Sequence, residues 1–260
     1  MNLDLAGRHA LVCGASEGIG RAAAMELALL GARVTVLARR AAVLEELAAA
    51  LPCPTGQRHG ALAVDVGDTG SLSAAVRQLA SEAPVQVLVN NTGGPPGGPV
   101  HGADAEAFLD AFRKHLLANQ ALVQALLPGM RAAGYGRIIN VISTSVKEPI
   151  AGLGVSNTIR GAVASWAKTL AGELAADGIT VNNVLPGFTR TGRLASLIAA
   201  RAKDGRSEDD VAASMLAQVP AGRFAEPEEV AAAIAFLASP AAAYVNGINL
   251  PVDGGRTRSL

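Results

Sequence analysis

Aromatic residues and cysteines are scarce in this chain of 260 residues. Phe, Trp and Tyr make up 3% of it, and the two cysteines are Cys13 and Cys53. So few aromatic rings argue against a surface that stacks on nucleic-acid bases. One cysteine in a predicted strand and one in a predicted loop provide neither a disulfide framework nor a metal site, so we expect no metal.

The chain also lacks net charge and long apolar runs. Its 22 Lys and Arg residues balance 22 Asp and Glu residues, so no net field attracts nucleic acid or an anionic membrane. No apolar run reaches the length of a membrane span, and the N-terminus lacks the basic flank and apolar stretch of a signal peptide. We therefore expect a cytoplasmic protein that binds a small molecule and neither nucleic acid nor membrane.

A glycine-rich turn is what the chain does have. Mostly apolar residues 9–13 precede it, and residues 21–28 after it have helical spacing. Glycines allow the backbone to turn tightly and to approach a pyrophosphate. The N–H groups at the start of the helix then face the negative charge of that pyrophosphate. The alternative is a purely structural turn. The residues that we expect to bind the phosphates are Gly14, Ser16, Gly18, Ile19 and Gly20.

The second predicted strand, Val34–Ala38, ends in Arg39 and Arg40. In a dinucleotide-binding fold this position meets the adenosine ribose, where an acid binds the 2′-hydroxyl and an arginine accommodates a 2′-phosphate. No acid is present, so we expect NADP, with NAD as the alternative. The two arginines could instead be a solvated start of the next helix.

The third predicted strand, Leu62–Val66, carries a carboxylate near its carboxyl end. Asp65 could accept a hydrogen bond from the adenine amino group, or it could start the turn into the predicted helix 69–83. We favour the cofactor and place Asp65 and Val66 beside the adenine.

Strand and helix patterns alternate along the whole chain, which predicts an α/β protein with a doubly wound parallel sheet. We expect a single domain over 1–260, with a helical, polar segment at about 188–221 that forms a mobile cover over the site. A loop rich in Gly and Pro, 90–99, would lie at the ligand-binding edge of the sheet. The other predicted strands are 85–89, 137–143, 179–185 and 247–252, and the other helices are 41–51, 104–133 (with an interruption near Pro128), 156–177 and 226–237.

Five ordered motifs together resemble the short-chain dehydrogenase/reductase family over essentially the whole chain, and the layout is similar to that of its 3-oxoacyl-acyl-carrier-protein reductases. They are Gly14–Gly20, Asp65-Val66, Asn90–Gly93, Pro186-Gly187 followed by Thr191, and Val252–Gly255.

The resemblance implies a Rossmann-type fold, a carbonyl or alcohol substrate, a nicotinamide cofactor and a homo-oligomer, either a tetramer or a dimer. It also implies that Asn91 and Gly93 lie along the cofactor ribose. Thr191, Pro186 and Gly187 would then hold the nicotinamide carboxamide.

The catalytic positions depart from the family pattern of serine, tyrosine, lysine and a helical asparagine. Counting from Ser143 places Ser156 at the tyrosine position and Arg160 at the lysine position. Counting along the long helix places His115 at the asparagine position. The chain thus resembles a divergent subgroup in which Ser-Asn-x-x-Arg replaces Tyr-x-x-x-Lys.

Some of the chemistry of carbonyl reduction survives these replacements. Ser143 could polarise the substrate oxygen, and Arg160 could orient the ribose, whereas Ser156 is a far poorer acid than tyrosine. Lys147, His115 or an ordered water could supply the proton, although each of the two side chains could instead have an ordinary structural role.

We therefore predict an NADP-dependent oxidoreductase with an atypical site. The alternative is a catalytically weak or inactive dinucleotide-binding protein with a regulatory or interaction role.

Overall fold

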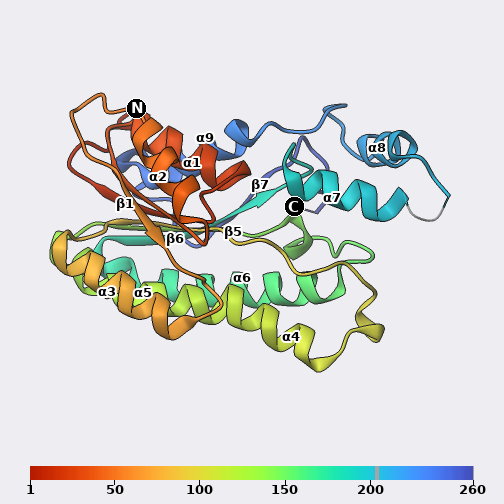
Figure 1. Ribbon diagram of the computed structural model, residues 1–260, viewed down its shortest axis with the longest axis horizontal. Coiled ribbons are helices and arrows are strands. Elements are labelled where there is room, and N and C mark those ends of the chain that lie inside the picture. Colours follow the sequence, from red (N-terminus) through yellow and green to blue (C-terminus); the bar gives the residue numbers. More distant parts are fainter. Residues whose placement is uncertain (203–204, 260) are drawn as a thin grey trace.

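The computed structural model describes residues 1–202 and 205–259. Seven parallel strands form one sheet in the order β3-β2-β1-β4-β5-β6-β7 (Figure 1). Sheet order and helix placement confirm the predicted doubly wound α/β fold. The strands are β1 (His9–Cys13), β2 (Arg33–Ala38), β3 (Gly60–Ala63), β4 (Val87–Asn90), β5 (Gly136–Val141), β6 (Ile179–Pro186) and β7 (Asn249–Val252).

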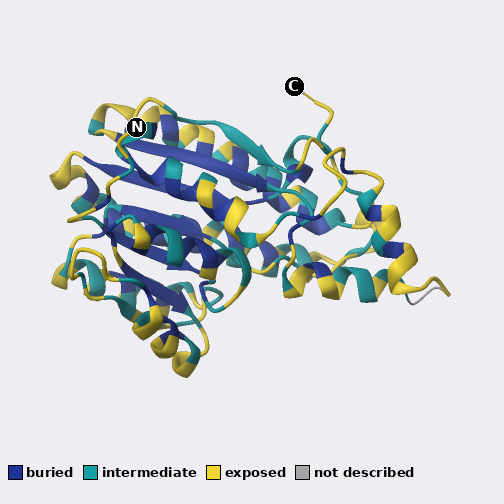
Figure 2. Ribbon diagram, turned by 90° about the horizontal axis from the view of Figure 1, so that it is seen from above, coloured by how far each residue is buried: buried dark blue, intermediate teal, exposed yellow. Residues whose placement is uncertain are grey.

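Helices cover both faces of the sheet, and the views in Figures 1 and 2 show the resulting layers. One face carries α1 (Gly18–Leu29), α2 (Ala41–Ala50) and α9 (Pro227–Ala238). The other face carries α3 (Thr69–Glu82), α4 (Ala105–Phe112), α5 (Ala118–Ala133) and α6 (Gly154–Leu174). Beyond one end of the sheet lie α7 (Gly192–Arg201) and α8 (Glu208–Leu216), within the segment predicted as a cover.

The core sits between the sheet and each helical layer, because the strands are buried on both sides (Figure 2). Side chains alternate along a strand, so β1 points Ala10 and Val12 toward α1 and Leu11 and Cys13 toward α3 and α5. This explains why β1, β2 and β4 are mostly apolar and have no solvent-facing polar side.

The predicted helix 104–133 is interrupted, but the predicted place of the interruption is wrong. The break is a π-helical turn at Arg113–Leu117, and Pro128 lies inside α5. Proline removes one backbone donor, and the packing of this buried helix tolerates that loss. The π-helical turn places His115 inside the protein.

An asparagine ladder crosses four neighbouring strands. The side-chain amide of Asn90 donates to Asn140 at 2.8 Å, Asn140 donates to Asn183 at 2.9 Å, and Asn183 donates to Asn249 at 2.8 Å. The strand register aligns each pair directly. Buried amides are costly unless paired, so the ladder favours this one alignment of strands.

Three further findings concern metal binding, membrane-spanning helices and the two cysteines. Within 1–202 and 205–259, no three His, Cys, Asp or Glu residues are grouped so that they could hold a metal ion. In the same ranges, no helix is both long and apolar enough to cross a membrane. Cys13 and Cys53 are both free thiols.

Candidate active site

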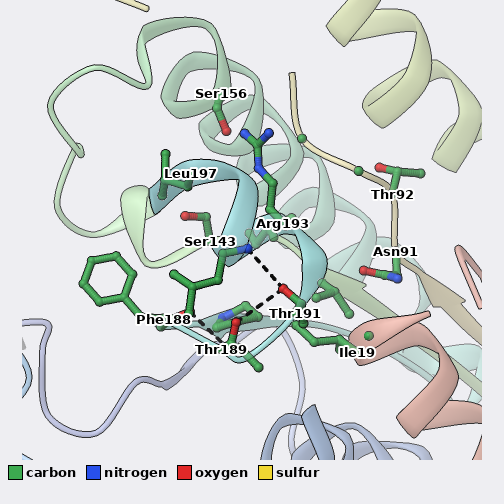
Figure 3. A pocket seen from close by; sticks show the side chains of 18 of the residues that line it. Ile19, Asn91, Thr92, Ser143, Ser156, Phe188, Thr189, Thr191, Arg193 and Leu197 are labelled. Atoms are coloured by element: carbon green, nitrogen blue, oxygen red, sulfur yellow. Dashed lines mark hydrogen bonds between the residues drawn. The ribbon is translucent and has the colours of Figure 1, made fainter. Parts of the chain in front are cut away.

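A pocket of about 280 Å³ opens at the carboxyl edge of the sheet, where β1 and β4 lie side by side. The chain leaves these two strands in opposite directions around the sheet, which creates a crevice outside their carboxyl ends. The pocket is lined by the glycine turn after β1, the loop after β4, Ser143, α6 and the start of α7 (Figure 3).

The glycine turn fits an anion. Gly14 and Gly18 have positive φ angles of 60° and 56°, which favour glycine. A side chain on Gly20 would collide with the carbonyl oxygen of Gly14, so only glycine lets α1 start this close to β1. The Glu17 side chain does not cap α1, whose first turn contains no acid. The free N–H groups of that turn therefore suit the pyrophosphate of a dinucleotide.

Arg40 lies beside the same turn. Its Nη2 donates to Ser16 Oγ at 3.1 Å and pairs with Glu17 Oε2 at 3.1 Å. Arg39 and Arg40 are both solvent-exposed, and no acid ends β2. This arrangement leaves guanidinium donors available to a 2′-phosphate.

Asp65 lies in a turn, two residues beyond the end of β3. Its Oδ1 accepts a hydrogen bond from the backbone N–H of Gly67 at 2.9 Å. This bond fits the alternative prediction, in which Asp65 starts the turn into the helix at 69–83. The residue is exposed, and its place beside an adenine stays a prediction. Val66 is half-buried against the cluster that includes Leu72 and Val76 on α3.

Asn91 supports the glycine turn, because its amide nitrogen donates to the carbonyls of Cys13 and Gly14 at 3.4 Å and 3.3 Å. The same residue lines the pocket, together with Gly93, whose surroundings are open. Asn91 thus ties the β4 loop to the phosphate-binding turn.

Ser143, Ser156 and Arg160 all line the pocket, so the structure brings these predicted residues together. Ser143 Oγ accepts from the backbone N–H of Ser145 at 3.1 Å, which leaves its hydroxyl hydrogen to donate. Ser156 and Arg160 lie one turn apart on α6 and are buried.

Arg160 donates to the backbone carbonyls of Val141 at 2.8 Å and Thr92 at 3.3 Å. Burial and the neighbouring Arg193 lower the pKa of Arg160 to about 10, so the side chain remains a cation at neutral pH.

His115 lies behind the pocket lining, and its Nδ1 is 2.6 Å from Thr92 Oγ1. The expectation that it titrates near neutrality is wrong. Burial, with added repulsion from Arg160 and Lys114, lowers the pKa of His115 to about 3. A neutral imidazole cannot serve as the acid that delivers a proton, so His115 can instead orient Thr92.

Lys147 is half-buried at the end of the 3₁₀ turn Thr144–Val146 and is not part of the pocket lining. The suggested pairing partner Glu148 accepts hydrogen bonds from the backbone N–H groups of Arg258 and Ser259.

Neither tyrosine stands in for the missing one. Tyr135 donates to the carbonyl of Ala238 at 2.7 Å, and Tyr244 is fully exposed.

Pro186 and Gly187 end β6 at the floor of the pocket, where the N–H of Gly187 donates to Val252 at 2.9 Å. A side chain on Gly187 would meet Asp253 at 2.7 Å, which explains why these two motifs occur together. Thr191 lines the pocket and caps α7 through its hydroxyl oxygen.

Sequence reasoning missed three residues. Arg193 lines the pocket and donates to the carbonyl of Pro95 at 2.8 Å. Asn157 holds the loop before α6 through two hydrogen bonds to the backbone of Ile150. Arg256 reaches from the C-terminal segment to Thr144 Oγ1 at 3.2 Å. The asparagine of the Ser-Asn-x-x-Arg motif was the one available signal for Asn157.

Comparisons with known proteins identify the family. Residues 14–257 match the family model described as enoyl-(acyl carrier protein) reductase. The chain is 37% identical to the 3-oxoacyl-[acyl-carrier-protein] reductase FabG of Vibrio harveyi, over 97% of this chain and 98% of that protein. It is 39% identical to the cis-4-hydroxycyclohexanecarboxylate dehydrogenase of Sinomonas cyclohexanicum, over 99% of each chain.

Among solved structures, the chain is similar to the L-sorbose reductase of Gluconobacter frateurii, complexed with NADPH and L-sorbose. The TM-score is 0.93 at 33% identity, with 100% of both chains covered. The chain therefore belongs to the short-chain dehydrogenase/reductase family. As a member of that family it is an oxidoreductase, and its cofactor is NADP.

Proposed function

We propose that this protein transfers hydride between NADP and a carbonyl or alcohol substrate in an atypical active site. Ser143, Ser156 and Arg160 act where the family uses serine, tyrosine and lysine. The observation that carries the proposal is that these three residues line the pocket that also contains the glycine turn. The bound dinucleotide supplies or accepts the hydride.

The protein residues bind and polarise the substrate oxygen. The hydroxyl groups of Ser143 and Ser156 donate hydrogen bonds to that oxygen as it gains negative charge. The buried cation of Arg160 adds positive potential beside it and orients the ribose through donors that the Val141 and Thr92 carbonyls do not use. Donors of this kind contribute roughly 10²–10³-fold each to the rate.

Water supplies the proton, because neither predicted acid suits the task. His115 is uncharged at neutral pH, and Lys147 is outside the pocket lining. Loss of a positioned acid costs roughly 10²–10⁴-fold in rate. We therefore expect slow turnover compared with relatives that retain the tyrosine.

The segment 188–221 covers the site in this proposal. Its described helices pack on each other through a separate small core that includes Leu194, Val211 and Met215, together with Phe224 just beyond the segment. The hydrogen bond from Arg193 to Pro95 joins this segment to the β4 loop across the pocket. Closure would shield the reacting atoms from bulk solvent and leave an ordered water to deliver the proton.

NADPH consumption with a panel of ketones and acyl thioesters tests the proposal. Ser143→Ala is expected to lower kcat by roughly 10²-fold or more, since one oxyanion donor is lost. Thr158→Ala is the matched control, because Thr158 lies on α6, is exposed and donates to Gly154 within the helix. No turnover of any substrate, despite tight NADPH binding, would refute the enzymatic proposal.

Such a result would favour a non-catalytic dinucleotide-binding protein, because the tyrosine and lysine positions hold Ser156 and Arg160. In that case NADPH raises the melting temperature without being consumed. The double variant Ser156→Tyr with Arg160→Lys would then create turnover where the natural protein has none.

A further inference from the structure

Two arginines from different elements converge in the pocket. Arg160 comes from α6 and Arg193 from α7. A methyl group built on Gly94 would lie 3.5 Å from Nη2 of Arg193 and 3.9 Å from Nη2 of Arg160, so both guanidinium groups approach one point beside Gly94. Figure 3 shows Arg193, Ser143 and Ser156 entering the pocket from three separate segments.

No carboxylate of the described chain forms an ion pair with either arginine. The two groups donate to the backbone carbonyls of Val141, Thr92 and Pro95, which use only some of the five N–H donors that each guanidinium carries. Glu17 is the acid in the pocket lining, and it pairs with Arg40 at 3.1 Å.

The two positive charges repel each other. Arg193 adds to burial in lowering the pKa of Arg160, which shows that the field of one arginine reaches the other. Arg160 is only 7% exposed, and a buried charge without a partner is unfavourable. An anion beside Gly94 would neutralise both charges and accept hydrogen bonds from some of the remaining N–H donors.

The phosphates of the cofactor have other partners available. The uncapped start of α1 and Arg40 provide donors for the pyrophosphate and the 2′-phosphate. Arg160, by contrast, lies one helical turn from Ser156, beside the expected position of the substrate oxygen. The pocket lining also includes apolar side chains, among them Ile142, Ile150, Leu153, Phe188 and Leu197.

We propose that the substrate is a keto acid, or the corresponding hydroxy acid, whose carboxylate is held by Arg160 and Arg193. This inference rests on the proposed function and names the substrate class. The carboxylate meets the two guanidinium groups, the carbonyl faces Ser143 and Ser156, and the hydrocarbon part contacts the apolar walls. Planar guanidinium groups match a carboxylate through paired N–H···O bonds.

Binding to the NADPH complex tests the inference. The probes are pyruvate, acetoacetate and levulinate, each compared with its neutral methyl ester, and the readout is quenching of NADPH fluorescence. We expect at least one acid to bind about tenfold or more tightly than its ester, as a charge-assisted hydrogen bond predicts. Arg193→Leu should abolish that preference, and Arg193→Lys should restore part of it.

Arg190→Leu is the matched control. Arg190 lies three residues earlier, pairs with Glu226 at 2.9 Å and is outside the pocket lining, so its loss should leave the preference unchanged. Arg193 is exposed, and replacing it should not prevent folding.

Three results would overturn the inference. Equal binding of acids and esters, or no binding by any acid, would show that the arginines do not select a carboxylate. Preserved selectivity in Arg193→Leu would also do so. A loss of NADPH affinity in that variant without a change in selectivity would assign Arg193 to the cofactor phosphates instead.

Failure of the proposed function gives a different pattern. Turnover of neutral ketones with equal binding of acids and esters would leave the enzyme proposal intact and refute only the carboxylate. Absence of all turnover with intact NADPH binding would refute the enzyme proposal.

Discussion

The buried His115 should make the free energy of unfolding depend on pH, and His115→Asn should remove that part of the pH dependence. Its pKa falls from 6.5 to about 3 on folding. Below about pH 6.5 the unfolded chain binds a proton at this residue and the folded chain does not, so stability present above that pH is lost as the pH falls toward 3. His115 is only 3% exposed, so solvent screening does not reduce the effect much.

The size of the effect follows from the pKa shift. Each pH unit in this window costs about 1.4 kcal/mol of unfolding free energy. Between about pH 6.5 and about pH 4.5, His115 should therefore cost about 2 kcal/mol, because the unfolded histidine is only half protonated at the upper limit. Other groups also titrate there, including His9, whose pKa burial lowers to about 4, but they are common to protein and variant and cancel in the comparison.

The assay is urea unfolding of the natural protein and His115→Asn across that pH window. We expect the difference in unfolding free energy between the two to shift by about 2–3 kcal/mol in favour of the variant as the pH falls. His101→Asn is the control, because it makes the same substitution at a histidine that is exposed and outside the pocket lining. Parallel pH profiles for natural protein and His115→Asn would refute the conclusion that His115 is held neutral, and would restore it as a candidate acid.

Two further predictions concern the cofactor and the sheet. Arg40→Ala should weaken NADPH binding about tenfold or more without weakening NADH binding, because a charged partner of the 2′-phosphate is lost. Arg33→Ala is the control, because Arg33 lies at the opposite end of β2. Fluorescence titration measures both affinities, and equal effects on the two cofactors would contradict the assignment. Asn140→Ala should lower the unfolding free energy by about 2–4 kcal/mol, since it leaves Asn90 and Asn183 without their buried partner. Urea unfolding measures this cost, and a loss below about 1 kcal/mol would show that the ladder has little energetic role.

Local patterns in the sequence were enough to place most of the elements. The apolar run His9–Cys13, the glycine turn and the helix after it correspond directly to β1, the turn and α1. Burial on both faces leaves a parallel strand such as β1 mostly apolar, so its position can be read from composition. The same motifs predicted that Ser143, Ser156 and Arg160 would share a site, and the structure places all three in the pocket lining.

Contacts between distant segments decided the features that the sequence did not reveal. Pro128 is a helix-breaking signal, but the packing of α5 outweighs the loss of one hydrogen bond, and the break occurs at 113–117 instead. The asparagine ladder was invisible because its four members come from different strands and only the register aligns them.

The electrostatics of the site also required the tertiary structure. The sequence placed His115 near the catalytic residues, yet its charge state depends on burial and on Arg160, which lies 45 positions away in the chain. Arg193 gave no local signal, because its importance comes from meeting Arg160 and Pro95 across the pocket. Short-range patterns determined the strands, helices and cofactor turn, whereas burial and the distances between charges from remote segments arise only when the chain is folded, and they decided the chemistry of the pocket.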